Sequence, residues 1–166
     1  RIAIIDTGTD TDHQSFDAGA FEYAIAEDAE KAEKTVADYN LLTVEEIAEK
    51  LSKLNASKRS SGLTADDLYL TSKLPFGYNY IDKGLEITHD KDTQGEHGSH
   101  VAGIATANRY IPDGNGGYSE ALKTVLTQGV APDAQLLTMK VFGKNGGAYD
   151  SDYMAAIEDA IVLGCD

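Results

Sequence analysis

The chain has 166 residues, of which 42% are hydrophobic and 25% charged, an ordinary composition for a globular domain with a sizeable core. Acidic residues outnumber basic ones 28 to 14, and the net charge of −14 argues against nucleic acid as a partner, because binding phosphates requires clustered Lys and Arg. No apolar run reaches membrane-spanning length, so we expect no membrane contact from this segment, and Cys165 is the single cysteine, which excludes a disulfide within the chain.

The first predicted element is a buried strand. Ile2 to Ile5 is apolar and mostly β-branched, and Asp6 follows it at the start of the polar stretch "DTGTDTDH". Catalytic groups of open parallel sheets gather beyond the carboxyl ends of the strands, so Asp6 is a candidate functional residue. A strand-end Asp also commonly caps a local turn. The triplet "DTG" is found in aspartic proteases too, but those enzymes need two such carboxylates, and the sequence has no second D-T-G or D-S-G.

A region rich in Glu, Lys and Ala follows, from about residue 21 to 75. It predicts a helical stretch from about Phe21 to Asp38 and a second helix after Thr43, which has capping-box spacing with Glu46. This second helix carries a single apolar stripe, made of Ile47, Leu51 and Leu54. Because the region is strongly charged and has only this stripe, we expect it to be a helical surface appendage rather than part of the core.

Strands and helices alternate along the later half of the chain. "PFGYNYID" and "AQLLTMKVF" read as strands, and the Gly-rich stretch "RYIPDGNGGYSE" as a loop. A helix beginning at His97 and a helix closed by Gly164 complete the pattern. The apolar faces expected on these two helices consist of Val101, Ile104 and Ala105 on the first, and Met154, Ile157 and Ile161 on the second. The alternation predicts an α/β domain with a largely parallel sheet flanked by helices.

His97 and His100 lie three positions apart in "GEHGSHVAGIA" and allow several interpretations. A zinc site would need a third ligand, for which His89, Asp92 and Glu96 are close in sequence. The metalloprotease patterns H-E-x-x-H and H-x-x-E-H are absent, and we assign no metal. A satisfied core histidine is the usual fate of a lone His and fits His100, which we expect to be mostly buried.

A third interpretation makes His97 a general base. If Asp6 contacted the other nitrogen of its ring, the carboxylate would fix the tautomer and stabilise the imidazolium as it forms. A residue at the carboxyl end of a strand and one at the amino end of a helix can meet in one crevice, so we expect a hydrogen bond between Asp6 and Nδ1 of His97.

These stretches resemble the subtilisin-like serine proteases, the subtilase family. "IAIIDTGTDTDH" resembles the segment with the family's catalytic Asp, and "HGSHVAGIA" its His segment, usually H-G-T-H-V-A-G. "GVAPDAQLLTMKVF" and "AIEDAIVLG" resemble the strand and helix that follow. The resemblance implies a partial subtilisin-like fold, with Asp6 as the triad aspartate, His97 as the general base and His100 as a second, structural histidine. "GKNGGA" resembles the edge segment that pairs with substrate, so the candidate substrate contacts are Gly146, Gly147 and Ala148.

The chain also departs from the family pattern. The helical insertion at about 21–75 is similar to that of the cell-envelope proteases, the lactocepin and C5a-peptidase-like branch. No G-T-S-x-A motif is present, so the serine nucleophile is missing from this chain. We therefore interpret residues 1–166 as an incomplete subtilase catalytic domain from a longer protein, inactive on its own and able to self-associate. The alternative is a non-catalytic binding or adhesion protein that keeps the subtilase fold.

The resemblance also implies partners and location. The partner would be a protein or peptide substrate, and the location extracellular or at the cell wall. Subtilases often bind calcium, so a calcium ion is compatible with the resemblance. The loop from Asp113 to Glu120 has oxygen ligands on alternate residues, but it lacks the EF-hand pattern, and we assign it no cofactor.

Overall fold

The computed structural model describes residues 1–88, 90 and 92–165 and has three parallel strands at its centre. The strand order is β1 (Ile2–Asp6), β5 (Leu136–Lys140) and β2 (Phe76–Asn79), so the last strand in the chain lies between the other two. All three strands run in the same direction, and Lys140 is the register partner of both Asp6 and Asn79. The carboxyl ends of the strands therefore meet at one edge, as predicted for an α/β domain.

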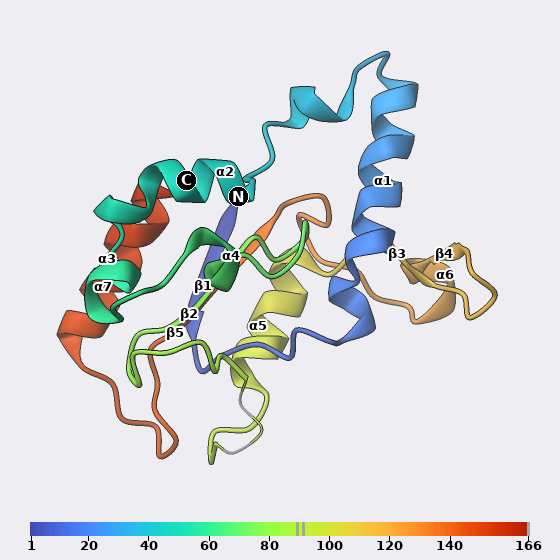
Figure 1. The fold of residues 1–166 in the computed structure, drawn as a ribbon. Coiled ribbons are helices and arrows are strands. Elements are labelled where there is room, and N and C mark those ends of the chain that lie inside the picture. Colours follow the sequence, from blue (N-terminus) through green and yellow to red (C-terminus); the bar gives the residue numbers. More distant parts are fainter. Residues whose placement is uncertain (89, 91, 166) are drawn as a thin grey trace.

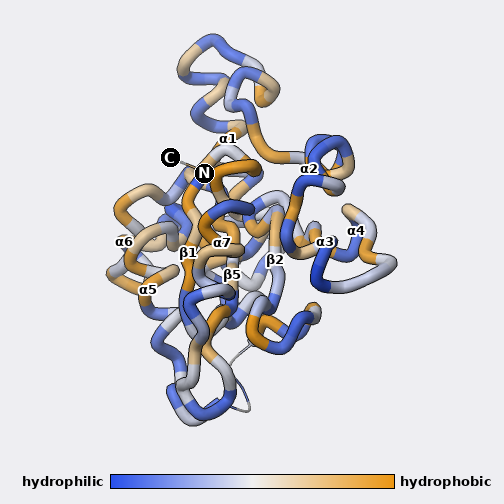
Figure 2. Tube along the Cα trace, turned by 90° about the vertical axis from the view of Figure 1, so that its left-hand side faces the viewer, coloured by the Kyte–Doolittle hydropathy of each residue, from blue (hydrophilic) through white to orange (hydrophobic). Residues whose placement is uncertain are grey.

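Helices cover both faces of this sheet (Figure 1). Side chains alternate along β5: Leu136 joins the cluster with Ala102 of α5 (His97–Thr106), whereas Leu137 and Met139 join the cluster with Ala156 of α7 (Asp150–Val162). The strand is buried along its whole length because each face is covered. In the hydropathy view β1 is largely apolar, and many of the loops at the periphery are hydrophilic (Figure 2).

The remaining elements are short apart from α1. They are η1 (Gln14–Phe16), α1 (Ala18–Lys31), η2 (Val36–Tyr39), α2 (Val44–Lys50), η3 (Leu51–Lys53), α3 (Asn55–Arg59), α4 (Ala65–Leu68), β3 (Tyr110–Pro112), β4 (Tyr118–Glu120) and α6 (Ala121–Thr124). Within the described part of the chain, no helix has both the length and the apolar character needed to cross a bilayer.

The helix predicted from Phe21 to Asp38 is shorter than expected. It ends at Lys31 because Glu33 adopts a left-handed backbone conformation, with φ at 53°, and the amide of Lys34 donates back to the carbonyl of Ala29. Figure 1 shows the far end of α1 and the following segment projecting from the body of the molecule.

The prediction that region 21–75 is only a surface appendage is wrong. Its projecting end fits the description, but six of its side chains are fully or almost fully buried in the main core beside Tyr78 and Met139 of the sheet: Leu42, Ile47, Leu54, Ala56, Ala65 and Leu68. The predicted stripe is the contact surface, since Ile47 and Leu54 are inaccessible and Leu51 packs against the same cluster. Thr43 caps α2 through the amide of Glu46 as expected.

The apolar face predicted for α7 is also wrong. Met154, Ile157 and Ile161 are 62%, 47% and 68% exposed, and the buried face instead carries alanines together with Asp152 and Asp159. These two carboxylates hold the insertion against α7, so polar contacts take the place of a continuous apolar stripe. Gly164 closes the helix as predicted, with φ at 77°.

Residues 109–120, expected to be a loop, form the antiparallel hairpin of β3 and β4. At its turn, Oδ1 of Asp113 accepts hydrogen bonds from the amides of Asn115 and Gly117, at 2.8 and 2.9 Å. These bonds lower the pKa of Asp113. The carboxylate thus organises its own turn, and this is the local role that the structure gives it.

Candidate active site

Asp6 and His97 meet although 91 positions separate them in the sequence. Nδ1 of His97 lies 2.7 Å from Oδ1 of Asp6, within hydrogen-bond distance. Asp6 is the last residue of β1 and His97 the first of α5, so the pair stands at the carboxyl edge of the sheet. The expected contact between these two residues is therefore present.

Thr7 connects the two partners. Its amide donates to Oδ1 of Asp6 at 2.7 Å, and its hydroxyl oxygen accepts from the amide of Gly98 at 2.9 Å. The first bond orients the carboxylate, and the second fixes the start of α5 relative to the end of β1. The sequence pattern does not mark Thr7 as a functional residue, although Thr7 directly follows Asp6.

Two glycines allow this close approach. A Cβ atom on Gly98 would lie 2.1 Å from the carbonyl oxygen of Gly8, so any larger residue would push α5 away from β1. Gly8 has φ at 112°, and a Cβ atom on Gly8 would lie 2.3 Å from the carbonyl oxygen of Ile87. Steric crowding therefore explains why glycine stands at position 8, two positions after Asp6, and at position 98, directly after His97. Both glycines are visible in the two quoted motifs.

The two catalytic candidates differ in exposure. The Asp6 side chain is 14% exposed, whereas that of His97 is 65% exposed. A sheltered carboxylate on Nδ1 selects the tautomer in which Nε2 carries a lone pair, and an open imidazole can take a proton there from a nearby hydroxyl. The geometry is that of the acid–base half of a nucleophilic mechanism.

His100 is not buried as expected. Its side chain is 74% exposed, with Nε2 3.5 Å from a carboxylate oxygen of Glu96. The buried face of α5 instead consists of its smallest residues and one hydroxyl: Gly98, Ala102 and Thr106. The apolar face predicted for α5 is also wrong, since Ile104, its largest member, is 69% exposed.

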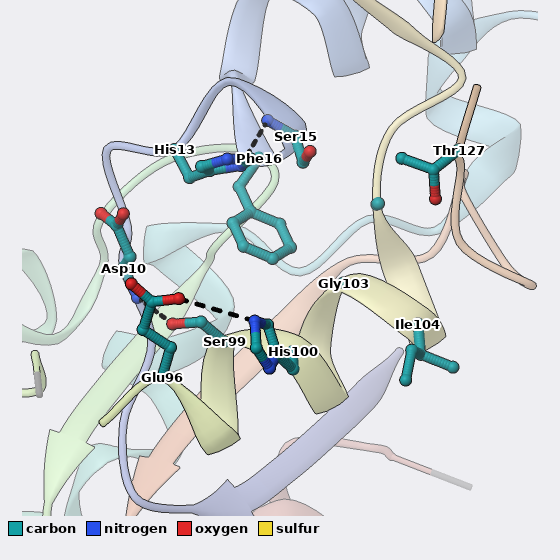
Figure 3. Close-up of a pocket in the computed structure, with 11 residues that line it drawn as sticks. Asp10, His13, Ser15, Phe16, Glu96, Ser99, His100, Gly103, Ile104 and Thr127 are labelled. Atoms are coloured by element: carbon teal, nitrogen blue, oxygen red, sulfur yellow. Dashed lines mark hydrogen bonds and ion pairs between the residues drawn. The ribbon is translucent and has the colours of Figure 1, made fainter. Parts of the chain in front are cut away.

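A pocket of about 500 Å³ lies on this exposed side of α5 (Figure 3). Its lining includes Asp10, Phe16, Ser99 and His100 but neither of the two catalytic candidates. Oγ of Ser99 accepts from the amide of Asp10 at 2.8 Å, which ties the loop after β1 to α5. The pocket therefore adjoins the site without containing its reactive groups.

The segment of Gly146, Gly147 and Ala148 forms part of a turn rather than an extended strand. The amide of Gly146 donates to the carbonyl of Gly143, and the amide of Gly143 to the carbonyl of Gly147, at 2.9 and 2.8 Å. Gly146 and Gly147 are exposed and Ala148 is half-buried, so the expectation of partial solvent access is met. The extended geometry is absent at Gly146, whose φ is 81°.

The zinc interpretation gains no support. Among residues 1–88, 90 and 92–165, no group of three or more His, Cys, Asp or Glu side chains is placed to hold a metal ion. His97 faces Asp6, and Asp92 forms an ion pair with Lys140. His89, another of the candidate ligands, lies outside the described residues.

Comparison with known proteins agrees with this geometry. The chain is 43% identical over 101 residues to a PII-type proteinase of Lacticaseibacillus paracasei and a PI-type proteinase of Lactococcus lactis subsp. cremoris, covering 59% of this chain and 5% of each relative. It is 29% identical over 167 residues to the C5a peptidase of Streptococcus pyogenes serotype M3, covering 98% of this chain and 11% of that protein.

These relatives confirm the expected cell-envelope protease branch, and the chain spans only a small part of their length. The profile described as the subtilase family matches residues 1–166, the whole chain. The chain therefore belongs to the subtilase family.

Proposed function

We propose that this chain is the N-terminal part of the catalytic domain of a subtilisin-like serine endopeptidase. The observation that carries the proposal is the 2.7 Å contact between Asp6 and His97, made by the two residues that match the family's Asp and His segments. The named proteinases and peptidases among the relatives support the same reaction class.

In the proposed mechanism, a serine from another part of the longer protein attacks the carbonyl carbon of the scissile peptide bond. Nε2 of His97 takes the proton of the serine hydroxyl and later passes it to the leaving amine. Asp6 keeps the proton on Nδ1 and stabilises the imidazolium through the bond described above. Water then hydrolyses the acyl-enzyme, with His97 acting as base a second time.

We further propose that the substrate is a protein or an extended peptide, cleaved outside the cell or at the cell wall. The substrate backbone would lie along Gly147 and Ala148, where the turn that begins at Gly143 closes through the carbonyl of Gly147. The exposure of Gly147 and the open space around its Cβ position support this placement. The amide of Gly146 is already bonded within the turn, so we place this residue at the end of the contact.

The experiment is peptide cleavage by the full-length protein and its variants. Asp6→Asn should lower kcat about 10⁴-fold, and His97→Ala by about 10⁶-fold, with the protein still folded. Asp12→Asn and His13→Gln change the same residue types at exposed positions a few residues after Asp6, and both should cleave like the unmodified protein. Cleavage that persists in His97→Ala would refute the proposal. If the unmodified full-length protein is folded but cleaves no peptide, the binding-protein alternative is favoured.

A further inference from the structure

Lys140, a residue outside the Asp6–His97 pair, has its charged group buried at the same edge of the sheet. It is the last residue of β5 and the register partner of Asp6, so both side chains leave the sheet on the same face. The Lys140 side chain is only 2% exposed, and that of its ion-pair partner Asp92 is 8% exposed. Burying two charges is costly, and such a pair rarely stabilises a fold more than apolar residues would. The arrangement therefore calls for another explanation.

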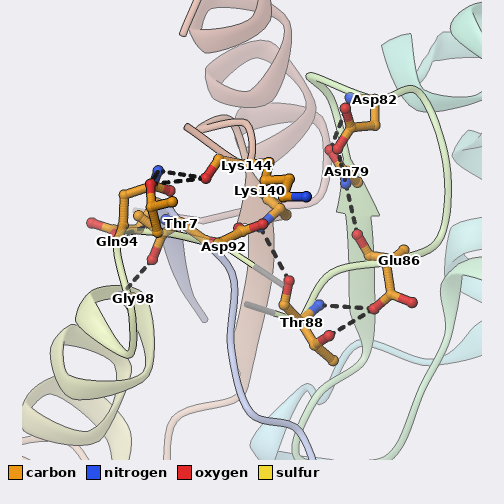
Figure 4. Close-up of polar contacts among 12 residues, drawn as sticks. Thr7, Asn79, Asp82, Glu86, Thr88, Asp92, Gln94, Gly98, Lys140 and Lys144 are labelled. Atoms are coloured by element: carbon orange, nitrogen blue, oxygen red, sulfur yellow. Dashed lines mark hydrogen bonds and ion pairs between the residues drawn. The ribbon is translucent and has the colours of Figure 1, made fainter. Parts of the chain in front are cut away.

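The ammonium group of Lys140 has a partner for each of its three protons (Figure 4). Nζ donates to the carbonyl oxygen of Thr7 at 2.6 Å and to that of Thr88 at 3.1 Å, and it contacts Oδ2 of Asp92. A neutral side chain of similar size could not satisfy all three acceptors. Lys140 thus joins the end of β1 to residues that precede α5 in the chain.

Thr7 is the point at which this contact reaches the site. All three of its hydrogen-bonding groups are used: the amide on Asp6, the hydroxyl on Gly98 and the carbonyl on Lys140. The amide of Thr7 lies in the peptide plane it shares with Asp6, and its carbonyl lies in the next plane, which it shares with Gly8; the two planes meet at the Cα of Thr7. If the carbonyl lost its donor, the backbone dihedrals of Thr7 would be less restrained, and the amide that orients the Asp6 carboxylate would be held less firmly.

The ammonium group of Lys140 also holds the loop before α5, together with hydrogen bonds from neighbouring residues. Thr88 also contacts Glu86, whose carbonyl accepts from Asn79 at the end of β2. Thr93 and Gln94 donate to the carbonyl of Lys144, close to the proposed substrate edge. The ends of β2 and β5 therefore hold the loop that precedes α5, and the end of β1 contacts the start of α5 through Thr7 and Gly98.

We propose that Lys140 is a positioning residue for the Asp6–His97 pair, acting through the carbonyl of Thr7. The proposal rests on the proposed protease function. It differs from a simple charge-balancing role, in which Lys140 would serve only to neutralise Asp92. The two roles make different predictions for a protein that has lost both charges.

The test compares Lys140→Met with the double variant Lys140→Met/Asp92→Asn in the full-length protein. Both should lower kcat about 100-fold through misalignment, with KM within about twofold of the unmodified protein. The double variant leaves no unpaired buried carboxylate, so it serves as the test where the single variant does not fold. A double variant with the kcat of the unmodified protein would show that Lys140 only balances charge, and would overturn the proposal.

Lys73→Met is the matched control. Lys73 is also fully buried and also donates to two carbonyls, those of Pro132 and Ala134, but it lies beside the first residue of β5, at the other end of the strand. Its loss should leave kcat unchanged. An equal fall in kcat for Lys73→Met would show that any lost buried lysine has this effect, which would also overturn the proposal.

A second readout needs no catalysis and separates this inference from the proposed function. The Nδ1 proton of His97, bonded to Asp6, should give a far-downfield proton resonance in the unmodified protein at low pH. We expect this resonance to move upfield or vanish in the folded double variant and to persist in Lys73→Met. An unchanged resonance in the double variant would contradict the positioning role even if the protein cleaved no peptide.

Discussion

Arg59 in α3 and Asp152 in α7 form an ion pair, with Nη1 of the guanidinium 2.5 Å from Oδ1 of the carboxylate. The same guanidinium donates to the carbonyl of Ser151, and Asp159, about two turns further along α7, accepts from the amides of Asn55 and Ala56 at 2.6 and 2.9 Å. The insertion is therefore held against α7 by an ion pair and by the Asp159 carboxylate, which caps the start of α3.

This attachment means that deleting residues 22–72 should prevent folding. The deletion would remove core side chains, the Arg59 partner of Asp152 and the two backbone amides that donate to Asp159, which would retain the hydroxyl of Tyr80. Removing the partners of buried carboxylates is strongly destabilising. Circular dichroism and amide-exchange measurements on the shortened chain would show the loss. A cooperative unfolding transition after the deletion would show that the sheet forms without the insertion.

A point substitution tests the same role more gently. Ile47 is inaccessible to solvent, so Ile47→Ala should lower the free energy of unfolding by about 2–5 kcal/mol through lost burial and a residual cavity. Val36 lies in the same region but is 48% exposed, and Val36→Ala should change that free energy by no more than about 0.5 kcal/mol. Denaturant titrations of the two variants would distinguish a core role from a peripheral one, since equal effects would contradict the core role.

The sequence predicted the contact between Asp6 and His97 because each residue lies in a short, distinctive motif at the end of an element. Which face a helix buries was harder to predict. α5 packs through Gly98, Ala102 and Thr106, which carry little hydrophobicity, so the larger Ile104 suggested the wrong face. The core role of the insertion depends on contacts made about 100 positions apart, such as Asn55 with Asp159, and no local pattern reveals them.

The tight contact between Gly98 and Gly8 makes α5 sensitive to a single methyl group. Gly98→Ala should displace the helix start, lowering kcat of the full-length protein about 100-fold and the melting temperature of the chain. Gly103 lies on the same helix with no atom within 4 Å of its Cβ position. Gly103→Ala should therefore raise the stability of the chain by about 0.5–1 kcal/mol. Equal stability changes for the two variants would contradict the steric argument.

The proposed substrate edge can be blocked without straining the fold. Gly147 has open space at its Cβ position and a φ outside the left-handed region, so Gly147→Val should fold normally. The added side chain should hinder an approaching peptide backbone and raise KM for peptide substrates. Gly84→Val, at a site with similar free space, serves as the control and should leave KM unchanged. If KM is unchanged in Gly147→Val as well, these residues do not contact substrate.

The chain by itself should show no serine-hydrolase activity. Asp6 and His97 can accept and hold a proton, but the sequence contains no G-T-S-x-A segment to supply a nucleophile. A fluorophosphonate probe should therefore leave the purified chain unlabelled, while it labels the full-length protein at one serine. Stoichiometric labelling of a serine within residues 1–166 would show that this chain carries its own nucleophile.

The buried Lys73 gives the chain a stability that depends on pH. Burial lowers the pKa of Lys73 from 10.5 to about 7, and the nearby carboxylate of Asp133 opposes this shift only in part. Between these two pH values the unfolded chain binds more protons at this position than the folded chain does. The free energy of unfolding should therefore rise as the pH increases through this window.

Replacement of Lys73 by Met isolates this contribution, because every other titrating group is kept. The free energy of unfolding of the unmodified chain, minus that of Lys73→Met, should increase steadily from about pH 7 to pH 10. Below this range the lysine is charged in both the folded and the unfolded state, so the difference should be constant. Denaturant titrations at several pH values would measure it, and parallel pH profiles for the two chains would show that Lys73 titrates near its ordinary pKa in the folded state.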